Sequence, residues 1–144
     1  MVGGSGGGGA RAASRRPLRL WPGGLRGGAA GPRLARMSGL ILLEISCPDR
    51  ATAERIGAAL LARRLAACVH LGAPFRSLYR WKGVVEDAEE APLAAVTRAE
   101  LFEAAAAAAR ELHPYETPGI LALPLAAATE DYVAWVREET APQD

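Results

Sequence analysis

The sequence predicts an α+β domain in which strands and helices follow one another in the order βαββαβα. Two observations carry this prediction. Apolar runs of strand length alternate with stretches of helical periodicity, and Gly or Pro residues separate most of these segments. The chain of 144 residues has room for one domain with its own core. Half of its residues are hydrophobic, although many of these are alanines, which bury little area each.

The first elements occupy residues 40 to 71. Leu40–Ser46 is a short apolar run typical of a strand. Pro48 and Asp49 end this strand and begin a helix, for which Asp49 is the expected N-cap. The helix has an apolar stripe at helical spacing, formed by Ala53, Ile56, Leu60, Leu61 and Leu65. The second strand then begins at Cys68–Leu71.

The second half of the chain predicts a long hairpin followed by a helix, a strand and a helix. The second strand resumes after Pro74, and Lys82-Gly83 is the expected turn, because glycine readily adopts the positive φ that such turns need. The return strand continues to Thr97. The remaining expected elements are a helix over Ala99–Leu112, a strand over Ile120–Leu125 and a helix over Glu130–Glu139. Six consecutive alanines, Ala104–Ala109, form the centre of the first of these helices, where we expect strong helix propensity and little packing.

This order of elements is the ferredoxin-like arrangement, βαββαβ, with an additional C-terminal helix. One face of such a sheet normally meets water, and its strands then alternate apolar and polar residues. The strands Leu40–Ser46 and Ile120–Leu125 are instead apolar almost throughout. The hairpin strands are also longer than usual. Both features predict an oligomer that forms through the sheets.

Charge divides the chain at residue 36. Residues 1–36 are rich in glycine and contain seven arginines and no acidic residue, so we expect a disordered leader followed by a folded domain over residues 37–144. The leader is consistent with sequence upstream of a start at Met37, with a mitochondrial presequence or, less well, with an RNA-binding tail. The folded part has 10 basic and 16 acidic residues, which argues against nucleic acid as its partner.

Four motifs, in this order and spacing, resemble the CutA family of small proteins named for divalent-cation tolerance. The resemblance runs from about Leu40 to Glu138, and its motifs are Leu65–Cys68, Ser77–Gly83, His113–Pro118 and Asp131–Trp135. It implies a compact homotrimer and a role in tolerance of divalent cations, copper especially. The sequence contains no nucleophile elbow, phosphate-binding loop or HExxH motif, so we expect no enzymatic activity.

His113, Cys68 and His70 are the candidate metal ligands. Cys68 and His70 are two residues apart on an expected strand and would share a face. The resemblance places proposed copper ligands of the family at Ile45, Leu112 and His113, and only His113 can coordinate a metal. We therefore expect at most weak binding of Cu(II) or another divalent cation, because affinity follows the number and geometry of the ligands. A helix cap is the simpler role for His113.

Tyr115, Glu116, Trp81 and Trp135 are the candidate residues of a ligand cleft. Backbone around Pro114 is irregular, and irregular segments held by rigid elements often carry sites. The cleft supports an alternative function, a trimeric small-molecule sensor or scaffold that resembles PII-like signalling proteins, with its ligand between subunits. The aromatic residues also fit a subunit interface. Two cysteines and no apolar run long enough to span a bilayer favour a cytoplasmic protein, or a mitochondrial one if the leader is a presequence.

Overall fold

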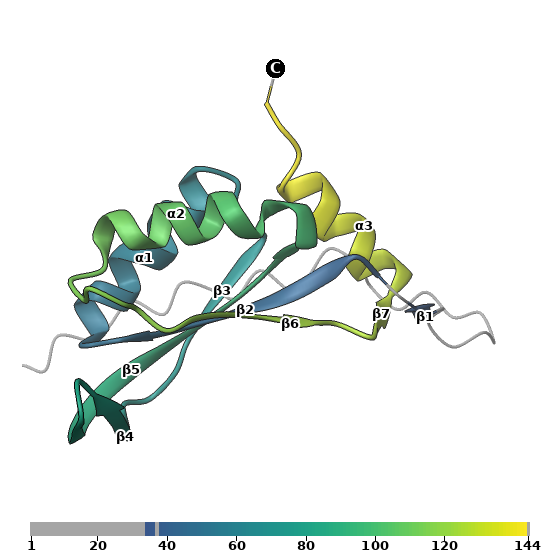
Figure 1. The fold of residues 1–144 in the computed structure, drawn as a ribbon. Coiled ribbons are helices and arrows are strands. Elements are labelled where there is room, and N and C mark those ends of the chain that lie inside the picture. Colours follow the sequence, from purple (N-terminus) through teal and green to yellow (C-terminus); the bar gives the residue numbers. More distant parts are fainter. Residues whose placement is uncertain (1–33, 37, 144) are drawn as a thin grey trace, which may run out of the picture. The chain divides into compact units, whose positions relative to one another are not determined.

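A computed structural model describes residues 34–36 and 38–143. Within them, the order of elements from residue 40 onward agrees with the sequence prediction except for the short strand β7, and α3 has the predicted bounds (Figure 1). The elements are β1 (Leu34–Arg36), β2 (Leu40–Cys47), α1 (Arg50–Ala62), β3 (Cys68–Leu71), β4 (Phe75–Trp81), β5 (Val84–Arg98), the 3-10 turn η1 (Ala99–Leu101), α2 (Phe102–Leu112), β6 (Ile120–Pro124), β7 (Ala127–Thr129) and α3 (Glu130–Glu139).

The main sheet is antiparallel, with the strand order β3-β5-β2-β6. β5 has 15 residues, twice the length of most of its neighbours, and pairs with β2 over Ala91–Arg98. Its first half pairs with β4, and its second half pairs with β3. The hairpin of β4 and β5 therefore extends beyond the part of the sheet that the helices cover. At its tip, Lys82 and Gly83 both have positive φ, as the predicted turn requires.

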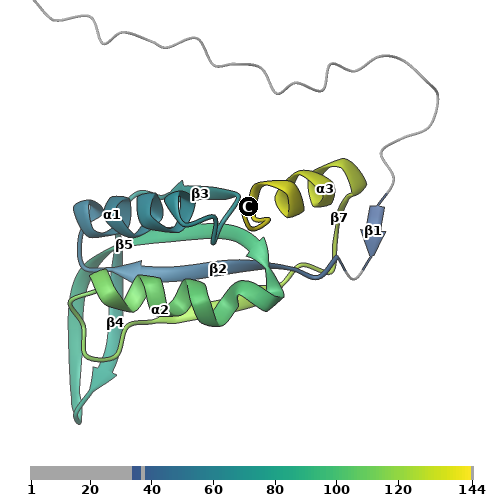
Figure 2. The same cartoon turned by 90° about the horizontal axis from the view of Figure 1, so that it is seen from above.

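Helices α1 and α2 cover one face of this sheet and lie on either side of β2 (Figure 2). Alternate residues of β2 and β5 point into the core beneath them, and they include Leu43, Ile45 and Leu93. From α1, Ile56 and Leu60 are fully buried against these residues. The predicted N-cap of α1 is confirmed, because the carboxylate of Asp49 accepts a hydrogen bond from the backbone N–H of Thr52 at 2.7 Å.

Two packing predictions for the helices are wrong. Leu61 belongs to the predicted stripe of α1 but is 44% exposed, because it follows the buried Leu60 directly and points about 100° away from it around the helix. The alanines of α2 pack well: Ala105, Ala108 and Ala109 are buried in the same core as α1. Small side chains allow a helix to approach its neighbours closely, and this is how an alanine-rich helix can still belong to a dense core.

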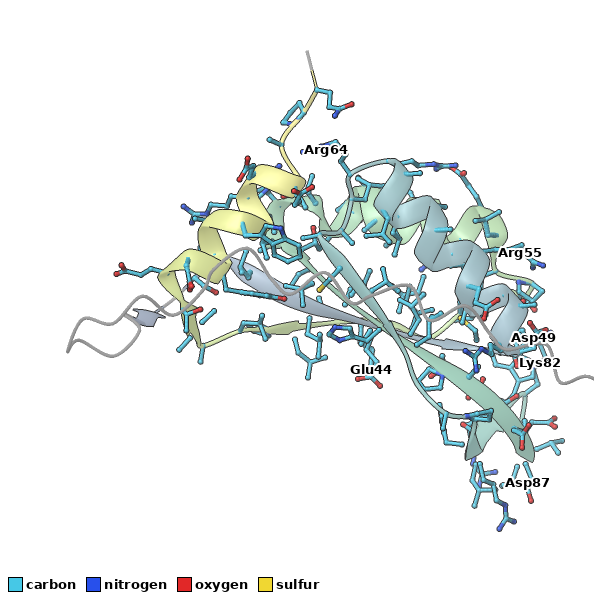
Figure 3. The ribbon with its side chains drawn as sticks, turned by 180° about the vertical axis from the view of Figure 1, so that it is seen from behind. Glu44, Asp49, Arg55, Arg64, Lys82 and Asp87 are labelled. Carbon is cyan, nitrogen blue, oxygen red and sulfur yellow. The ribbon has the colours of Figure 1, made fainter. Side chains whose placement is uncertain are left out.

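The other face of the sheet is covered only in part. Leu40, Leu42 and Val96 alternate with the residues that face α1 and α2, and they pack against Val133 and Val136 of α3. Further along this face, Leu121 and Leu123 of β6 are 58% and 44% exposed. Glu44, also exposed, points away from α1 and α2 (Figure 3). An apolar patch therefore remains on this face of the single chain.

Two features at the ends of the domain were not predicted. Residues 34–36, which the predicted leader includes, form β1, and this strand pairs with β7. The rest of the leader lies outside the described residues. Arg64, at the end of α1, donates hydrogen bonds to the carbonyl oxygens of Ala141 and Glu138, at 2.8 and 2.6 Å, and so holds the segment after α3 (Figure 3). None of the described helices combines the length and the apolar character needed to cross a membrane.

Candidate functional site

His113 ends α2 and fixes the loop that follows. Pro114 disfavours helical backbone at the residue before it, and His113 is extended, with φ −87° and ψ 126°. The residue is buried, with only 7% of its surface exposed. The Nε2 atom lies 2.8 Å from the carbonyl oxygen of Ser46, and the Nδ1 atom accepts a hydrogen bond from the backbone N–H of Tyr115 at 3.2 Å.

These two hydrogen bonds define the state of the ring. An acceptor at Nδ1 must be unprotonated, and a nitrogen facing a carbonyl oxygen must carry a proton, so His113 is the neutral Nε2–H tautomer. Both nitrogens are occupied, and a metal ion would have to displace one hydrogen bond to bind here. The geometry supports the structural role of His113 over its predicted role as a ligand.

The other two candidate ligands lie on β3, away from His113. Cys68 pairs in register with Val96 and His70 with Ala94, so both side chains share a sheet face, as predicted. The Sγ atom of Cys68 lies 3.4 Å from the hydroxyl of Tyr132, while His70 is exposed. Burial, followed by the contact with Cys68, raises the pKa of Tyr132. Among the described residues, no three His, Cys, Asp or Glu side chains are grouped to hold a metal ion.

A cavity of about 540 Å³ lies between the β4–β5 hairpin and the loop after His113. Carboxylates, aromatic rings and hydroxyl groups line it. The lining residues are Ser46, Ser77, Tyr79, Trp81, Glu86, Glu90, Pro114, Tyr115, Glu116, Thr117 and Gly119. Its volume falls within the range of about 300 to 1,000 Å³ that is typical of small-molecule sites.

Three of the four predicted cleft residues meet at this cavity. Trp81, Tyr115 and Glu116 come from two segments far apart in the sequence, and the fold brings them together. Trp135 does not line this cavity: it packs on α3 beside Tyr132, with 5.5 Å between their ring centroids. Sequence reasoning missed the acidic residues Glu86 and Glu90. The two residues are four positions apart on β5, and this even separation is the signal that could have placed them on one face of the strand.

Glu90 is a buried carboxylate in the wall of the cavity. Its side chain is only 6% exposed, which is unusual for a carboxylate. Burial, followed by the negative charge of the nearby Glu90, raises the pKa of the Tyr115 phenol. The same carboxylate adds to burial and to Asp49 in raising the pKa of the Cys47 thiol to about 11. Cys47 is therefore a protonated, fully buried thiol.

Lys82 lies at the rim of the cavity, on the hairpin turn. Its Nζ atom is 3.3 Å from a carboxylate oxygen of Glu116 and 5.4 Å from the centroid of the Trp81 ring. Both charged side chains of this ion pair are more than two-thirds exposed, so the pair contributes little to stability. The ion pair does connect the tip of the β4–β5 hairpin to the loop after α2, and it lies at the opening of the cavity.

Comparison with known proteins gives the family. Residues 41–139 match the family model of the CutA1 divalent ion tolerance protein. The chain is 38% identical over 96 residues to the divalent-cation tolerance protein CutA of Thermus thermophilus, covering 67% of this chain and 93% of that protein. It is 36% identical over 96 residues to protein CutA of Homo sapiens, and the match covers 67% of this chain and 54% of the human protein. The chain thus matches about half the length of its human relative.

A solved structure agrees with the sequence matches. The periplasmic divalent cation tolerance protein CutA of Archaeoglobus fulgidus superposes with a TM-score of 0.68 at 32% identity, covering 71% of this chain and 99% of that chain. The fold is thus the mixed sheet-and-helix architecture of known CutA structures. The chain belongs to the CutA1 family of divalent ion tolerance proteins.

Proposed function

We propose that this protein is a non-enzymatic, trimeric member of the CutA1 family that takes part in tolerance of divalent cations, copper among them. The observation that carries the proposal is the family match over residues 41–139, which includes the sheet, all three helices and the cavity loop. Relatives named divalent-cation tolerance proteins support the role. The antiparallel order β3-β5-β2-β6 supports a ferredoxin-like fold.

The uncovered sheet face supports self-association. Leu121 and Leu123 project from β6 on the face opposite α1 and α2, where a second copy of the chain would remove them from water. The exposed hairpin residues Leu78, Val84 and Val85 add further apolar area, at 59–61% exposure. Exposed apolar area of this kind on one chain is typical of an interaction surface.

The proposed cation role does not depend on His113 as a ligand. Cys68 and His70 share a face of the edge strand β3 and offer one thiol and one imidazole, a donor set with which Cu(II) can bind weakly. We expect such binding to weaken at acidic pH, because both ligands must be deprotonated to coordinate a metal. Additional ligands from other subunits of the trimer would strengthen the binding of the metal ion.

The test is calorimetric titration of Cu(II) and Zn(II) into the wild-type chain, into the double variant Cys68→Ala/His70→Ala and into His113→Ala. Native mass spectrometry of the same samples gives the number of subunits and of retained metal ions. The proposal predicts a trimer, with weak binding that the double variant loses and His113→Ala keeps. A stable monomer, or tight binding lost only in His113→Ala, would contradict it.

A further inference from the structure

The cavity between the β4–β5 hairpin and the loop after His113 has the chemistry of a cation site. Three carboxylates, from Glu86, Glu90 and Glu116, lie in its wall, and no Lys, Arg or His does. Three aromatic rings, from Tyr79, Trp81 and Tyr115, complete the wall. Acidic groups beside aromatic faces attract positive charge through both Coulomb and cation–π interactions. The combination therefore favours a cationic ligand with organic character.

The burial of Glu90 is the strongest single observation in favour of a cation site. Its side chain is 94% buried, by its 6% exposure, and lines the cavity. No ion pair joins it to a Lys or Arg in the part of the chain that the structure describes. The phenol of Tyr115 lies near this carboxylate and brings no positive charge to it. A buried carboxylate without a cationic partner is costly, and a bound cation would remove that cost.

The rim of the cavity already holds an ammonium group. Lys82 places its Nζ atom 3.3 Å from the Glu116 carboxylate and 5.4 Å from the Trp81 ring centroid. Glu116 and Trp81 are themselves lining residues of the cavity. The protein's own side chain thus makes the kind of contacts at this rim that an incoming primary ammonium would make.

We propose that the cavity binds a small organic primary amine, with its ammonium group paired to Glu90 and its carbon chain against Trp81 and Tyr79. A bare metal ion fits less well, because divalent ions prefer several oxygen ligands converging on one point. The described residues form no such group of three. Lys82 competes with the ligand for Glu116 and Trp81. The inference goes beyond the role in cation tolerance and does not depend on it.

The test uses the full chain and 1,4-diaminobutane as the probe, with 1,4-butanediol as the uncharged probe of matched length. The indole N–H signal of Trp81, assigned with Trp81→Phe, is followed by NMR, and affinity is measured by calorimetry. We expect the diamine to shift this signal and the diol to leave it unchanged. Glu90→Gln should weaken diamine binding about tenfold or more through loss of a charge-assisted contact. The matched control Glu89→Gln, at the adjacent exposed position of β5, should bind like the wild type.

A second variant keeps the inference testable if Glu90→Gln is unstable. Lys82→Met removes the competing ammonium from an exposed turn, and we expect it to bind the diamine several-fold more tightly. Arg80→Met, two residues earlier on β4, is its control. The inference is overturned if the diol acts like the diamine, if millimolar diamine leaves Trp81 unchanged, or if Lys82→Met weakens binding. Mg²⁺ or Zn²⁺ that shifts Trp81 at lower concentration than the diamine would overturn it in favour of a metal site.

Discussion

His113 joins the end of α2 to the end of β2, because its Nε2 atom lies 2.8 Å from the carbonyl oxygen of Ser46. The backbone N–H of Ser46 also donates to the carbonyl oxygen of Gly119 at 3.3 Å. One residue of β2 thus binds both ends of the loop that forms a wall of the cavity. The shape of the cavity depends on a buried neutral imidazole.

We therefore predict that His113→Ala lowers the free energy of unfolding. The substitution leaves the Ser46 carbonyl and the Tyr115 N–H without their partners, which costs about 1–3 kcal/mol. His70→Ala is the matched control, since His70 is exposed and should be replaced at little cost. Urea unfolding followed by circular dichroism measures both. Equal stability of the two variants would show that the His113 hydrogen bonds contribute nothing.

Asp49 gives the domain a dependence on pH at the start of α1. The hydrogen bonds with Thr52 hold the pKa of Asp49 below its usual value. A carboxyl group with a lowered folded-state pKa stabilises the fold at pH values above its unfolded pKa, and this stability is lost as the pH falls through the folded-state pKa.

We accordingly predict that Asp49→Asn is less stable than the wild type at neutral pH and that the difference shrinks as the pH falls below about 4. Asparagine caps a helix as well as aspartate does but carries no charge for the helix dipole. Thermal midpoints from pH 7 to pH 3 give the comparison. A difference that stays constant over this range would exclude the carboxylate as its source. Asp49→Ala, which also loses the cap, should be the least stable of the three at neutral pH.

Local signals in the sequence were sufficient for most of the fold. Asp49 and Pro48 placed the start of α1, and Lys82-Gly83 placed the turn, because each of these is decided by the backbone preferences of one or two residues. The bounds of α3 followed from its helical periodicity. β1 and β7 were missed because three residues are too few to show a period, and their pairing depends on contacts between distant segments.

The site was harder to predict, because which residues line it depends on how the chain buries them in the fold. Trp81, Tyr115 and Glu116 were identified by residue type, and the fold brings them together. Trp135 was also chosen by residue type but does not line this cavity, since an aromatic residue on an amphipathic helix fits a core as well as a cleft. Glu90 was not singled out among its acidic neighbours on β5. It shares the cavity wall with the loop of residues 114–119, which is more than twenty residues away in sequence.

The uncovered sheet face gives a prediction about assembly. Leu121→Glu places a carboxylate on the face that we propose to be buried between subunits, and a buried unpaired charge costs several kcal/mol. We expect this variant to be folded but shifted to smaller species in light scattering. Leu61→Glu on α1 is the control, as Leu61 is also exposed but lies on a helix. Similar masses for wild type and both variants would exclude this face from the interface.

Gly57 packs α1 directly against the sheet. An alanine at this position would gain helix propensity but would also clash with the sheet. A Cβ atom at this position would lie 2.8 Å from Cγ1 of Val69 on β3 and 3.5 Å from Cδ1 of Leu93 on β5. Alanine gains about 1 kcal/mol over glycine in helix propensity. The clash opposes this gain, because a β-branched side chain such as valine has few rotamers with which to move away.

We predict that the clash dominates and that Gly57→Ala is destabilising overall by about 1–2 kcal/mol, since overpacking in a core costs about 1–3 kcal/mol. The double variant Gly57→Ala/Val69→Ala removes the clashing methyl groups, so the glycine substitution should cost less in the Val69→Ala background than in the wild type. Urea unfolding of the four proteins forms a double-mutant cycle that isolates this interaction. If Gly57→Ala is more stable than the wild type, or if the two substitutions are additive, α1 does not approach β3 as closely as the 2.8 Å contact requires.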